Sequence, residues 1–544
     1  MHSIVHHTNH AIRRAWWLAT TTVMLASHAT QVTAIPAQIP GDLDLSFAGG
    51  SGAISSLVIG LGTSQHLTAM ALQPDGKLVV AGYCDGPTSQ DFCVARINAD
   101  GTLDASFVGP LGNGGGKFLL DISTASDAAS ALLIQPDGKI VIAGTCYNGA
   151  NNDFCIARLN PNGTRDLTFN GPSGAGNGQV MLPIGASDDY ANAMALQPDG
   201  KIVLVGNCVS GGQNDFCAAR LNVDGSFDTT FVGPNNNGAG KFLFGMGISN
   251  DYAMAIALQS NGMILIAGYC VSAMVDFDFC IARLNSIGAF DTTFDGPAGN
   301  GNGKFLLPIG SSNDLLSAML IQPDGKIVLA GSCLVSVANN DFCVARLFSD
   351  GTYDATFDGP SGTGNGKILL PITAAKSDNV AALGLQPDGK IIIAGHCDNG
   401  GNEDFCVARL HIDGTLDASF DGPGGVSNGK FLLPVGSSDD VATTVLLQPD
   451  GKLVVAGDCY SGAASHFCIA RLYGGPFGYK HCTMDIDGDG KVLPTTDGLL
   501  LTRIALGMTG PSALTGAISP TATRNTWVTV RDYLANECGM TVAP

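Results

Sequence analysis

Residues 131–160 read ALLIQPDGKIVIAGTCYNGANNDFCIARLN, and the chain of 544 residues contains seven close copies of this stretch. A glutamine before Pro-Asp-Gly, or a close variant of it, marks each copy and recurs every 62 to 64 residues, at Gln73, Gln135, Gln197, Gln259, Gln322, Gln386 and Gln448. A fixed period of this length is typical of a repeat architecture in which each copy forms one supersecondary unit. A residue that recurs in every copy is therefore explained more simply by the fold than by a function.

Each copy is expected to contain four strands joined by tight turns. A segment such as 304–309 (KFLLPI) comes first, and an alternation of small and apolar residues such as 190–196 follows it. Pro-Asp-Gly then predicts a hairpin, because proline presets the turn and glycine supplies positive φ. The apolar run 201–206 indicates a strand buried on both faces, and 216–221 is expected to lie antiparallel to it.

The 16 cysteines are all expected to form disulfides, since an even number in an exported chain usually indicates disulfide bonds. Metal binding is the alternative, but two cysteines per copy without partner histidines would leave each metal half-coordinated. The expected pairs are Cys84/Cys93, Cys146/Cys155, Cys208/Cys217, Cys270/Cys280, Cys333/Cys343, Cys397/Cys406, Cys459/Cys468 and, near the C-terminus, Cys482/Cys538.

A short Leu-Asp-x-x-Phe element, or a variant of it, ends six of the copies and distinguishes a closed ring from an open solenoid. The element lies at 103–107, 165–169, 227–231, 290–294, 353–357 and 416–420. The seventh copy stops at Leu472 without it, but an extra element precedes the first copy at 43–47. An N-terminal segment that completes the last repeat closes a ring, whereas a solenoid needs polar caps. The fold predicted for 35–475 is therefore all-β, a seven-bladed β-propeller.

Over residues 41–473 the chain resembles the delta-60 repeat family of secreted bacterial proteins. The motifs that carry the resemblance are Gln-Pro-Asp-Gly-Lys, the following Ala-Gly, Ala-Arg-Leu-Asn and the Leu-Asp-x-x-Phe ending. The resemblance implies a propeller-like β fold and no particular activity.

The first 34 residues are expected to be a secretory signal peptide. Arg13 and Arg14 precede an apolar stretch at 15–26 that is too short to span a bilayer, and a cleavage site is expected after Ala34 or, as a second choice, after Ala29. No other segment could span a membrane. The mature protein is therefore expected to be secreted, and to be extracellular, on the cell surface or periplasmic.

The chain is acidic, with a formal net charge of −20. Nucleic acid is excluded as a partner, because little positive charge is available to neutralise phosphates. The acidity suits solubility, and it also suits a protein that meets divalent cations.

The segment DIDGDGK at 485–491 predicts a Ca²⁺ loop. Carboxylates at positions 1, 3 and 5, glycine at position 6 and a backbone carbonyl at position 7 can surround one hard cation. An acidic turn without an ion is the alternative interpretation. The predicted ligands are Asp485, Asp487, Asp489, the carbonyl of Lys491, and Asp497.

Residues 476–544 resemble the dockerin-type, EF-hand-like calcium module, with an exit helix from about Thr496 and a second helix at 526–536. The loop differs from that pattern because the acid expected at position 12 comes one residue late, at Asp497. A second calcium loop is also missing, which puts binding to a cohesin partner in doubt. Cys482 and Cys538 bracket this module and are expected to staple it.

Two further sets of aspartates recur in the repeats. One set lies just before the second strand, at Asp127, Asp189, Asp251, Asp314, Asp378 and Asp440, with His66 in the first copy. The other precedes Phe-Cys, at Asp91, Asp153, Asp215, Asp278, Asp341 and Asp404. Either set could line a rim and hold a cation, but such aspartates more often cap their own turns.

The expected function is that of a secreted, non-enzymatic binding or surface protein for an unidentified protein or carbohydrate. No familiar catalytic motif is present, and function is expected where the copies differ, at His396, His466 and the longer cysteine loops 271–278 and 334–341. The alternative is an extracellular hydrolase or lyase that acts on polysaccharide.

Overall fold

The computed structural model describes residues 39–59, 64–112, 115–174, 177–236, 238–272, 276–299, 302–336, 339–360, 362, 365–374, 376–424, 428–474, 486–488, 495–505 and 508–534. The predicted signal peptide lies outside these ranges. Within them, no helix is both long enough and apolar enough to cross a membrane.

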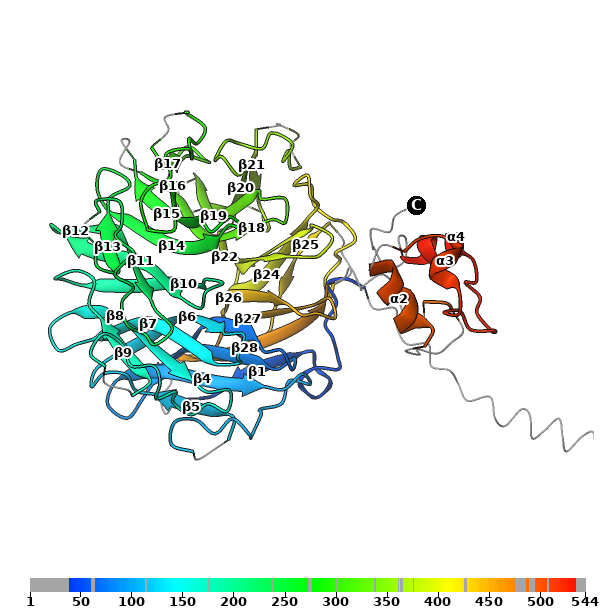
Figure 1. Ribbon diagram of the computed structural model, residues 1–544, viewed down its shortest axis with the longest axis horizontal. Helices are drawn as coiled ribbons and strands as arrows, with labels where there is room; N and C mark the ends of the chain where they lie inside the picture. The colour runs from blue at the N-terminus through cyan, green and yellow to red at the C-terminus, as the bar shows by residue number, and fades with distance from the viewer. Residues whose placement is uncertain are drawn as a thin grey trace, which may run out of the picture. The chain divides into compact units, whose positions relative to one another are not determined.

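Seven four-stranded antiparallel sheets form the blades of a propeller (Figure 1). Each inner strand contacts the inner strands of the blades before and after it, so the ring is closed. The predicted seven-bladed β-propeller is confirmed. The inner strands are β2 (Gln65–Leu72), β6 (Asp127–Ile134), β10 (Asp189–Leu196), β14 (Asp251–Leu258), β18 (Asp314–Ile321), β22 (Asp378–Leu385) and β26 (Asp440–Leu447).

The second and third strands of each blade form its hairpin. The second strands are β3 (Leu78–Asp85), β7 (Ile140–Tyr147), β11 (Ile202–Ser210), β15 (Ile264–Val271), β19 (Ile327–Ser336), β23 (Ile391–Asp398) and β27 (Lys452–Ser461). The third strands are β4 (Gln90–Ile97), β8 (Asn152–Leu159), β12 (Gln213–Leu221), β16 (Phe277–Leu284), β20 (Asn339–Leu347), β24 (Glu403–Leu410) and β28 (Ala464–Tyr473).

The outer strand of each blade is the Lys-Phe-Leu-Leu segment or its equivalent. The prediction that this segment comes first in its copy is wrong. β17 pairs with β16 of the preceding copy, with Phe279 opposite Leu307, so it ends that blade. The outer strands are β5 (Lys117–Leu120), β9 (Gln179–Leu182), β13 (Lys241–Phe244), β17 (Lys304–Leu307), β21 (Lys367–Leu370), β25 (Lys430–Leu433) and, in the seventh blade, β1 (Ala53–Leu57).

The hydrophobic core lies between neighbouring blades. Ile202 and Leu204 of β11 pack against the second blade, whereas Val203 and Val205 of the same strand pack against the fourth. This alternation explains why the second strand is an uninterrupted apolar run, as predicted for a strand buried on both faces.

The glycine two residues before the first cysteine of each copy faces a bulge in the inner strand. The register of β10 against β11 shifts between Ala191 and Ala193, which brings the carbonyl oxygen of Tyr190 close to Gly206. A Cβ atom at Gly206 would lie 1.8 Å from that oxygen. Glycine is therefore required at this position, because the backbone of the inner strand comes too close for any side chain.

One buried arginine per blade brings the repeated motifs together. In the third blade, Arg220 Nε donates to Asp228 Oδ2 at 2.8 Å, and Lys201 Nζ lies 3.2 Å from the same oxygen. The guanidinium also lies over the ring of Phe231 and donates to the carbonyl of Ser286 in the next blade. The arginine thus joins the Pro-Asp-Gly-Lys turn, the Leu-Asp-x-x-Phe element and the neighbouring blade.

The N-terminal segment completes the seventh blade, as predicted. Arg471 Nε donates to Asp44 Oδ2 at 2.8 Å, Lys452 Nζ lies 3.0 Å from the same oxygen, and the guanidinium lies over Phe47. Arg471 also donates to the carbonyl of Ala99 in the first blade. The segment contributes more than residues 43–47, because β1 pairs with β28 and provides the outer strand.

Seven disulfides join the second strand of each blade to the third, with Cα–Cα distances of 5.7–5.9 Å. They confirm the seven repeat pairs, Cys84–Cys93, Cys146–Cys155, Cys208–Cys217, Cys270–Cys280, Cys333–Cys343, Cys397–Cys406 and Cys459–Cys468. The expected pair Cys482/Cys538 lies outside the described residues.

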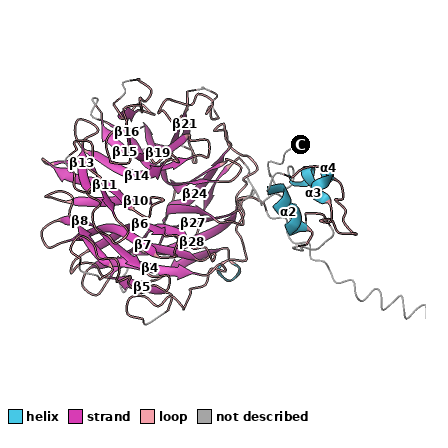
Figure 2. Ribbon diagram, viewed as in Figure 1, coloured by secondary structure: helices cyan, strands magenta, loops and turns pink. Residues whose placement is uncertain are grey.

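The described C-terminal residues form three helices, drawn in cyan in Figure 2. They are α2 (Asp497–Ala505), α3 (Pro511–Leu514) and α4 (Trp527–Asp532), and their small core contains Leu500, Val530 and Leu534. Thr526 caps α4 by accepting a hydrogen bond from the Thr529 N–H. Helices therefore occur in both places where the sequence predicts them.

Replacing Asp44 by alanine is expected to destabilise the ring strongly. Its carboxylate is buried, and its removal leaves the buried guanidinium of Arg471 without its partner, which costs about 3–5 kcal/mol. Urea unfolding of the full chain measures the loss. Asp75→Ala is the control, because Asp75 also pairs with a lysine but its side chain is 55% exposed, and it should change stability by less than about 1 kcal/mol. Equal losses of stability in the two variants would contradict the conclusion that the Asp44–Arg471 pair closes the ring.

Candidate binding surface and cation sites

The blades differ most near the ends that carry the disulfides. There, one residue of each inner strand lies directly opposite one residue of the second strand. The seven cross-strand pairs are His66/Tyr83, Ala128/Thr145, Tyr190/Asn207, Tyr252/Tyr269, Leu315/Ser332, Asn379/His396 and Val441/Asp458. We call these 14 residues the variable ring.

Aromatic and amide side chains gather in the third and fourth blades. Tyr252 stacks on Tyr269 with ring centroids 5.0 Å apart, and Phe277 lies edge-on to Tyr269 at 5.3 Å. Asn214 Nδ2 lies 3.3 Å from the hydroxyl oxygen of Tyr252, and Asn207 donates to Asn214 at 2.9 Å. Rigid aromatic groups with adjacent hydrogen-bonding groups are typical of binding surfaces.

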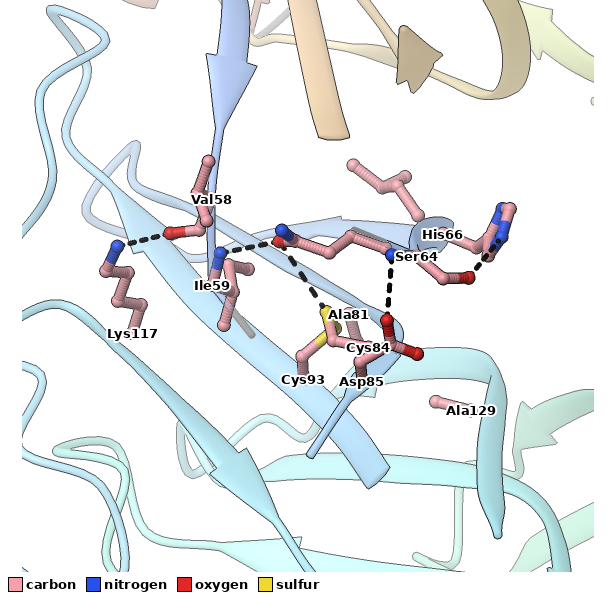
Figure 3. The surroundings of a disulfide bond; sticks show 12 residues. Val58, Ile59, Ser64, His66, Ala81, Cys84, Asp85, Cys93, Lys117 and Ala129 are labelled. Carbon is pink, nitrogen blue, oxygen red and sulfur yellow. Dashed lines mark hydrogen bonds between the residues drawn. A yellow bond between two sulfur atoms is a disulfide. The ribbon is translucent and has the colours of Figure 1, made fainter. Parts of the chain in front are cut away.

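A second cluster lies where the first blade meets the seventh. His66 Nδ1 lies 2.8 Å from Asp458 Oδ2, and His66 Nε2 lies 3.1 Å from Ser64 Oγ. Figure 3 shows the Ser64 side chain directed at the imidazole. The hydrogen bond to Asp458 raises the pKa of His66, although burial opposes the increase. The side chain of Asp458 is only 6% exposed, and that of His66 is 24% exposed.

This cluster was not predicted from the sequence. The prediction that His66 is the first-blade equivalent of the recurring aspartates is wrong, because Gln65 lies opposite Cys84 just as Asp127 lies opposite Cys146. An alignment of the seven copies would have drawn attention to Asp458, because it is the only acid among the seven second-strand positions of the variable ring.

The aspartates that begin the inner strands cap their own turns. Asp189 Oδ2 accepts hydrogen bonds from the N–H groups of Ile184 and Gly185, both at 2.8 Å. Asp127, Asp251, Asp314, Asp378 and Asp440 accept backbone hydrogen bonds in the same way. In the first blade, Gln65 Oε1 accepts from the Ile59 N–H at 2.6 Å. These residues therefore have a structural role.

The aspartates before Phe-Cys lie close to the capping aspartates of the next blade. Burial, together with the charges of Asp121 and Asp127, raises the pKa of Asp91 to about 6. Asp91, Asp121 and Asp127 bring carboxylate oxygens within 4.8 Å of one another, the only such group of three among the described residues. The outer strand of the second blade begins with Gln179, whereas the outer strands β13, β17, β21 and β25 of later blades begin with lysine. The cluster therefore lacks the ammonium group that a lysine at this position would supply.

Of the predicted calcium ligands, the structure describes Asp487 and Asp497, whereas Asp485, Asp489 and Lys491 lie outside the described residues. Both described carboxylates are buried. Asp497 Oδ1 accepts hydrogen bonds from the N–H groups of Ile486 at 2.5 Å and Asp487 at 3.2 Å. Asp497 therefore reaches back to the start of the loop, although it comes one position later in the sequence than expected.

His396 and His466 were also expected to contribute to function, and both lie near the ends of the blades that carry the disulfides. Burial lowers the pKa of His396, which favours its neutral form, and His466 lies opposite Cys459. The two longer cysteine loops, 271–278 and 334–341, are described only in part.

The family described as a domain of unknown function (DUF5122) beta-propeller matches seven segments, 73–107, 135–169, 197–231, 259–294, 322–357, 386–420 and 448–472. The chain is built from a propeller repeat. One match falls in each of the seven copies, which supports a propeller-like repeat family, although these matches name neither the delta-60 family nor a dockerin module. No curated protein is significantly similar in sequence.

Solved structures with a similar fold share little sequence with this chain. A streptogramin B lyase is 12% identical with a TM-score of 0.43, and the match covers 77% of this chain and 97% of that chain. The polysaccharide lyase Uly1 is 12% identical with a TM-score of 0.44 and coverages of 81% and 98%. Sqt1 of Chaetomium thermophilum, bound to the N-terminus of the ribosomal protein L10, is 12% identical with a TM-score of 0.40 and coverages of 77% and 99%. These likenesses concern the fold and carry no argument about ligand or activity.

Asp91 is expected to make the protein more stable at pH 5 than at pH 7. A pKa near 6 in the folded state, against about 3.9 when unfolded, means that the folded state binds more protons between these values, so this contribution falls as pH rises. Urea unfolding at both pH values measures the difference in the free energy of unfolding between pH 5 and pH 7. We expect Asp91→Asn to reduce this difference by about 1 kcal/mol. Asp75→Asn should leave it unchanged, and an unchanged difference in Asp91→Asn would contradict the assignment.

Proposed function

We propose that the protein is a secreted binding or surface protein in which the propeller presents a ligand-binding surface and the C-terminal segment binds calcium. The observation that carries the proposal is the variable ring. Seven copies agree closely where the blades hold together, and they differ at cross-strand positions near the disulfide ends. Secretion is supported by the seven disulfides and by the predicted signal peptide.

A rigid frame favours binding, because little conformational entropy is lost when a preformed surface meets its ligand. The disulfides, the buried arginines and the closed ring all restrain the strands that carry the variable ring. The ligand is proposed to be a protein or a carbohydrate that meets tyrosine hydroxyls, asparagine amides and aromatic faces.

Calcium is proposed to bind Asp485, Asp487, Asp489, the carbonyl of Lys491, and Asp497. The burial of Asp487 and Asp497 supports this proposal, because buried carboxylates require compensation by cations or hydrogen bonds. The return of Asp497 to the start of the loop also supports it, since the carboxylate after an EF-hand-like loop must reach back to share the ion.

Calorimetric titration of the full chain with Ca²⁺ tests the calcium proposal. We expect a site with a dissociation constant in the micromolar to millimolar range, which Asp487→Ala removes because a ligand is lost. The control is Asp532→Ala, since Asp532 is a partly exposed acid on α4 that pairs with Arg531. Absence of heat in the wild-type chain, or equal heats in wild type and Asp487→Ala, would contradict the proposal.

A glycan array, combined with a reducing-sugar assay, tests the binding proposal for carbohydrates. We expect binding without release of product, weakened about tenfold or more by Tyr252→Ala, because the stacked ring supplies contact area. Leu111→Ala, in which an 86% exposed residue outside the variable ring is truncated, should bind as the wild type does. Release of new reducing or unsaturated ends would instead favour the polysaccharide hydrolase or lyase.

A further inference from the structure

The repeats provide internal controls for the residues around His66. In five blades, the side chain at the position of Ser64 accepts a hydrogen bond from a backbone N–H of the first or second residue in the third strand of the preceding blade. These acceptors are Asp188, Asn250, Asn313, Ser377 and Asp439. Between the seventh and first blades the direction is reversed, because the Gln65 N–H donates to Ser465 Oγ at 2.9 Å. The Ser64 hydroxyl is directed instead at His66 Nε2, at 3.1 Å.

The same comparison identifies what is unusual about Asp458. At equivalent positions, the hydroxyls of Thr145 and Ser332 accept hydrogen bonds from the N–H groups of Ala191 and Val380 in the next blade. Asp458 Oδ1 makes the equivalent hydrogen bond, because it accepts from the Leu67 N–H at 2.7 Å. A hydroxyl would suffice for that contact. The carboxylate adds a second oxygen, which binds His66 Nδ1 at 2.8 Å.

We propose that Ser64, His66 and Asp458 form a nucleophilic site for acyl esters, with Ser64 as nucleophile, His66 as general base and Asp458 as the positioning residue. The order of contacts, hydroxyl to one ring nitrogen and carboxylate to the other, is the arrangement that activates a serine. Asp458 is held by its contact with Leu67, so it fixes the orientation of the imidazole. This inference goes beyond the proposed function, because ligand binding by the variable ring does not require it.

In the proposed step, Ser64 Oγ forms a bond to the ester carbonyl carbon while its proton passes to His66 Nε2. His66 then gives that proton to the leaving alkoxide as the ester C–O bond breaks, which leaves an acyl group on Ser64 and releases an alcohol. Water then attacks the acyl carbon while its proton passes to His66. The bond between the acyl carbon and Ser64 Oγ breaks, His66 returns the proton to Ser64 Oγ, and the carboxylic acid is released. The net reaction converts an ester and water into a carboxylic acid and an alcohol.

The surroundings suit this chemistry. Tyr83 packs its ring against the imidazole, with centroids 4.8 Å apart. Burial and the charge of Asp458 raise the pKa values of both Tyr83 and Tyr460, so their hydroxyls remain protonated at neutral pH. The charged groups that face His66 are Asp458 and Asp85, and both raise its pKa.

Labelling of the full chain with diisopropyl fluorophosphate, followed by peptide mass spectrometry, tests the proposal. Ser64 Oγ would displace fluoride from phosphorus, with its proton taken by His66 and passed to solvent. Ser126, the equivalent serine of the second blade, is the internal control, because Ala128 stands where the first blade has His66. We expect Ser64 to react about 100-fold faster than Ser126, and Ser64→Ala to remove the fast reaction.

His66→Ala should slow labelling of Ser64 about 100-fold, and the second blade, which carries alanine there, shows that the fold accepts this residue. Asp458→Asn retains an acceptor for the Leu67 N–H but loses the charge. The pH midpoint of labelling should therefore move downward, which a purely structural role would not produce. Failure of Ser64 to react faster than Ser126, or an unchanged labelling rate in His66→Ala, would overturn the proposal. Glycan binding remains a separate test of the proposed function.

Discussion

The contacts of one buried arginine per blade hold the propeller together. It binds the aspartate of its own blade, lies over a phenylalanine and donates to a carbonyl of the next blade. Burial alone would raise the pKa of Asp228, but hydrogen bonds from Thr230 and Lys201 and the charge of Arg220 outweigh it and lower that pKa to about 2. The link is therefore ionic throughout the neutral range. Because the seventh arginine finds its aspartate in the N-terminal segment, the same interaction closes the ring.

The residues that recur in the copies stabilise the fold, whereas the residues that differ between copies form the proposed binding surface. The arginine, aspartate and phenylalanine of each copy, with a lysine in six of the seven, join the blades to one another. The glycine permits the bulge, and the cysteines join the hairpin. The residues that differ lie near the disulfide ends, on strands that these contacts make rigid. The meeting of the first and seventh blades is the clearest case, because Asp458 keeps a structural hydrogen bond that a hydroxyl makes elsewhere and adds a carboxylate contact to His66.

The period, the cysteine spacing and the extra Leu-Asp-x-x-Phe element were enough to predict seven blades, seven disulfides and closure by the N-terminus. The place of the Lys-Phe-Leu-Leu strand was not predictable, because its pairing with the preceding copy is a long-range contact across a glycine-rich loop. The equivalence of Gln65, and not His66, with Asp127 follows from the period, because residues 65 and 127 are 62 apart, as Gln73 and Gln135 are. The pairing of Gln65 with Cys84 and of Asp127 with Cys146 agrees with it. His66 and Asp458 are 392 residues apart in sequence, so no local pattern could bring them together.

The N-terminal segment is an integral part of the seventh blade. In the structure, the Asp44 N–H donates to the Arg471 carbonyl, the Arg471 N–H donates to the Gly52 carbonyl, and the Tyr473 N–H donates to the Asp42 carbonyl. Native-state amide hydrogen exchange of the full chain measures these bonds directly. We predict that the amides of Asp44, Arg471 and Tyr473 are as strongly protected as those of Asp228 and Arg220 in the third blade. Rapid exchange at Asp44, Arg471 and Tyr473 while the third blade remains protected would contradict it.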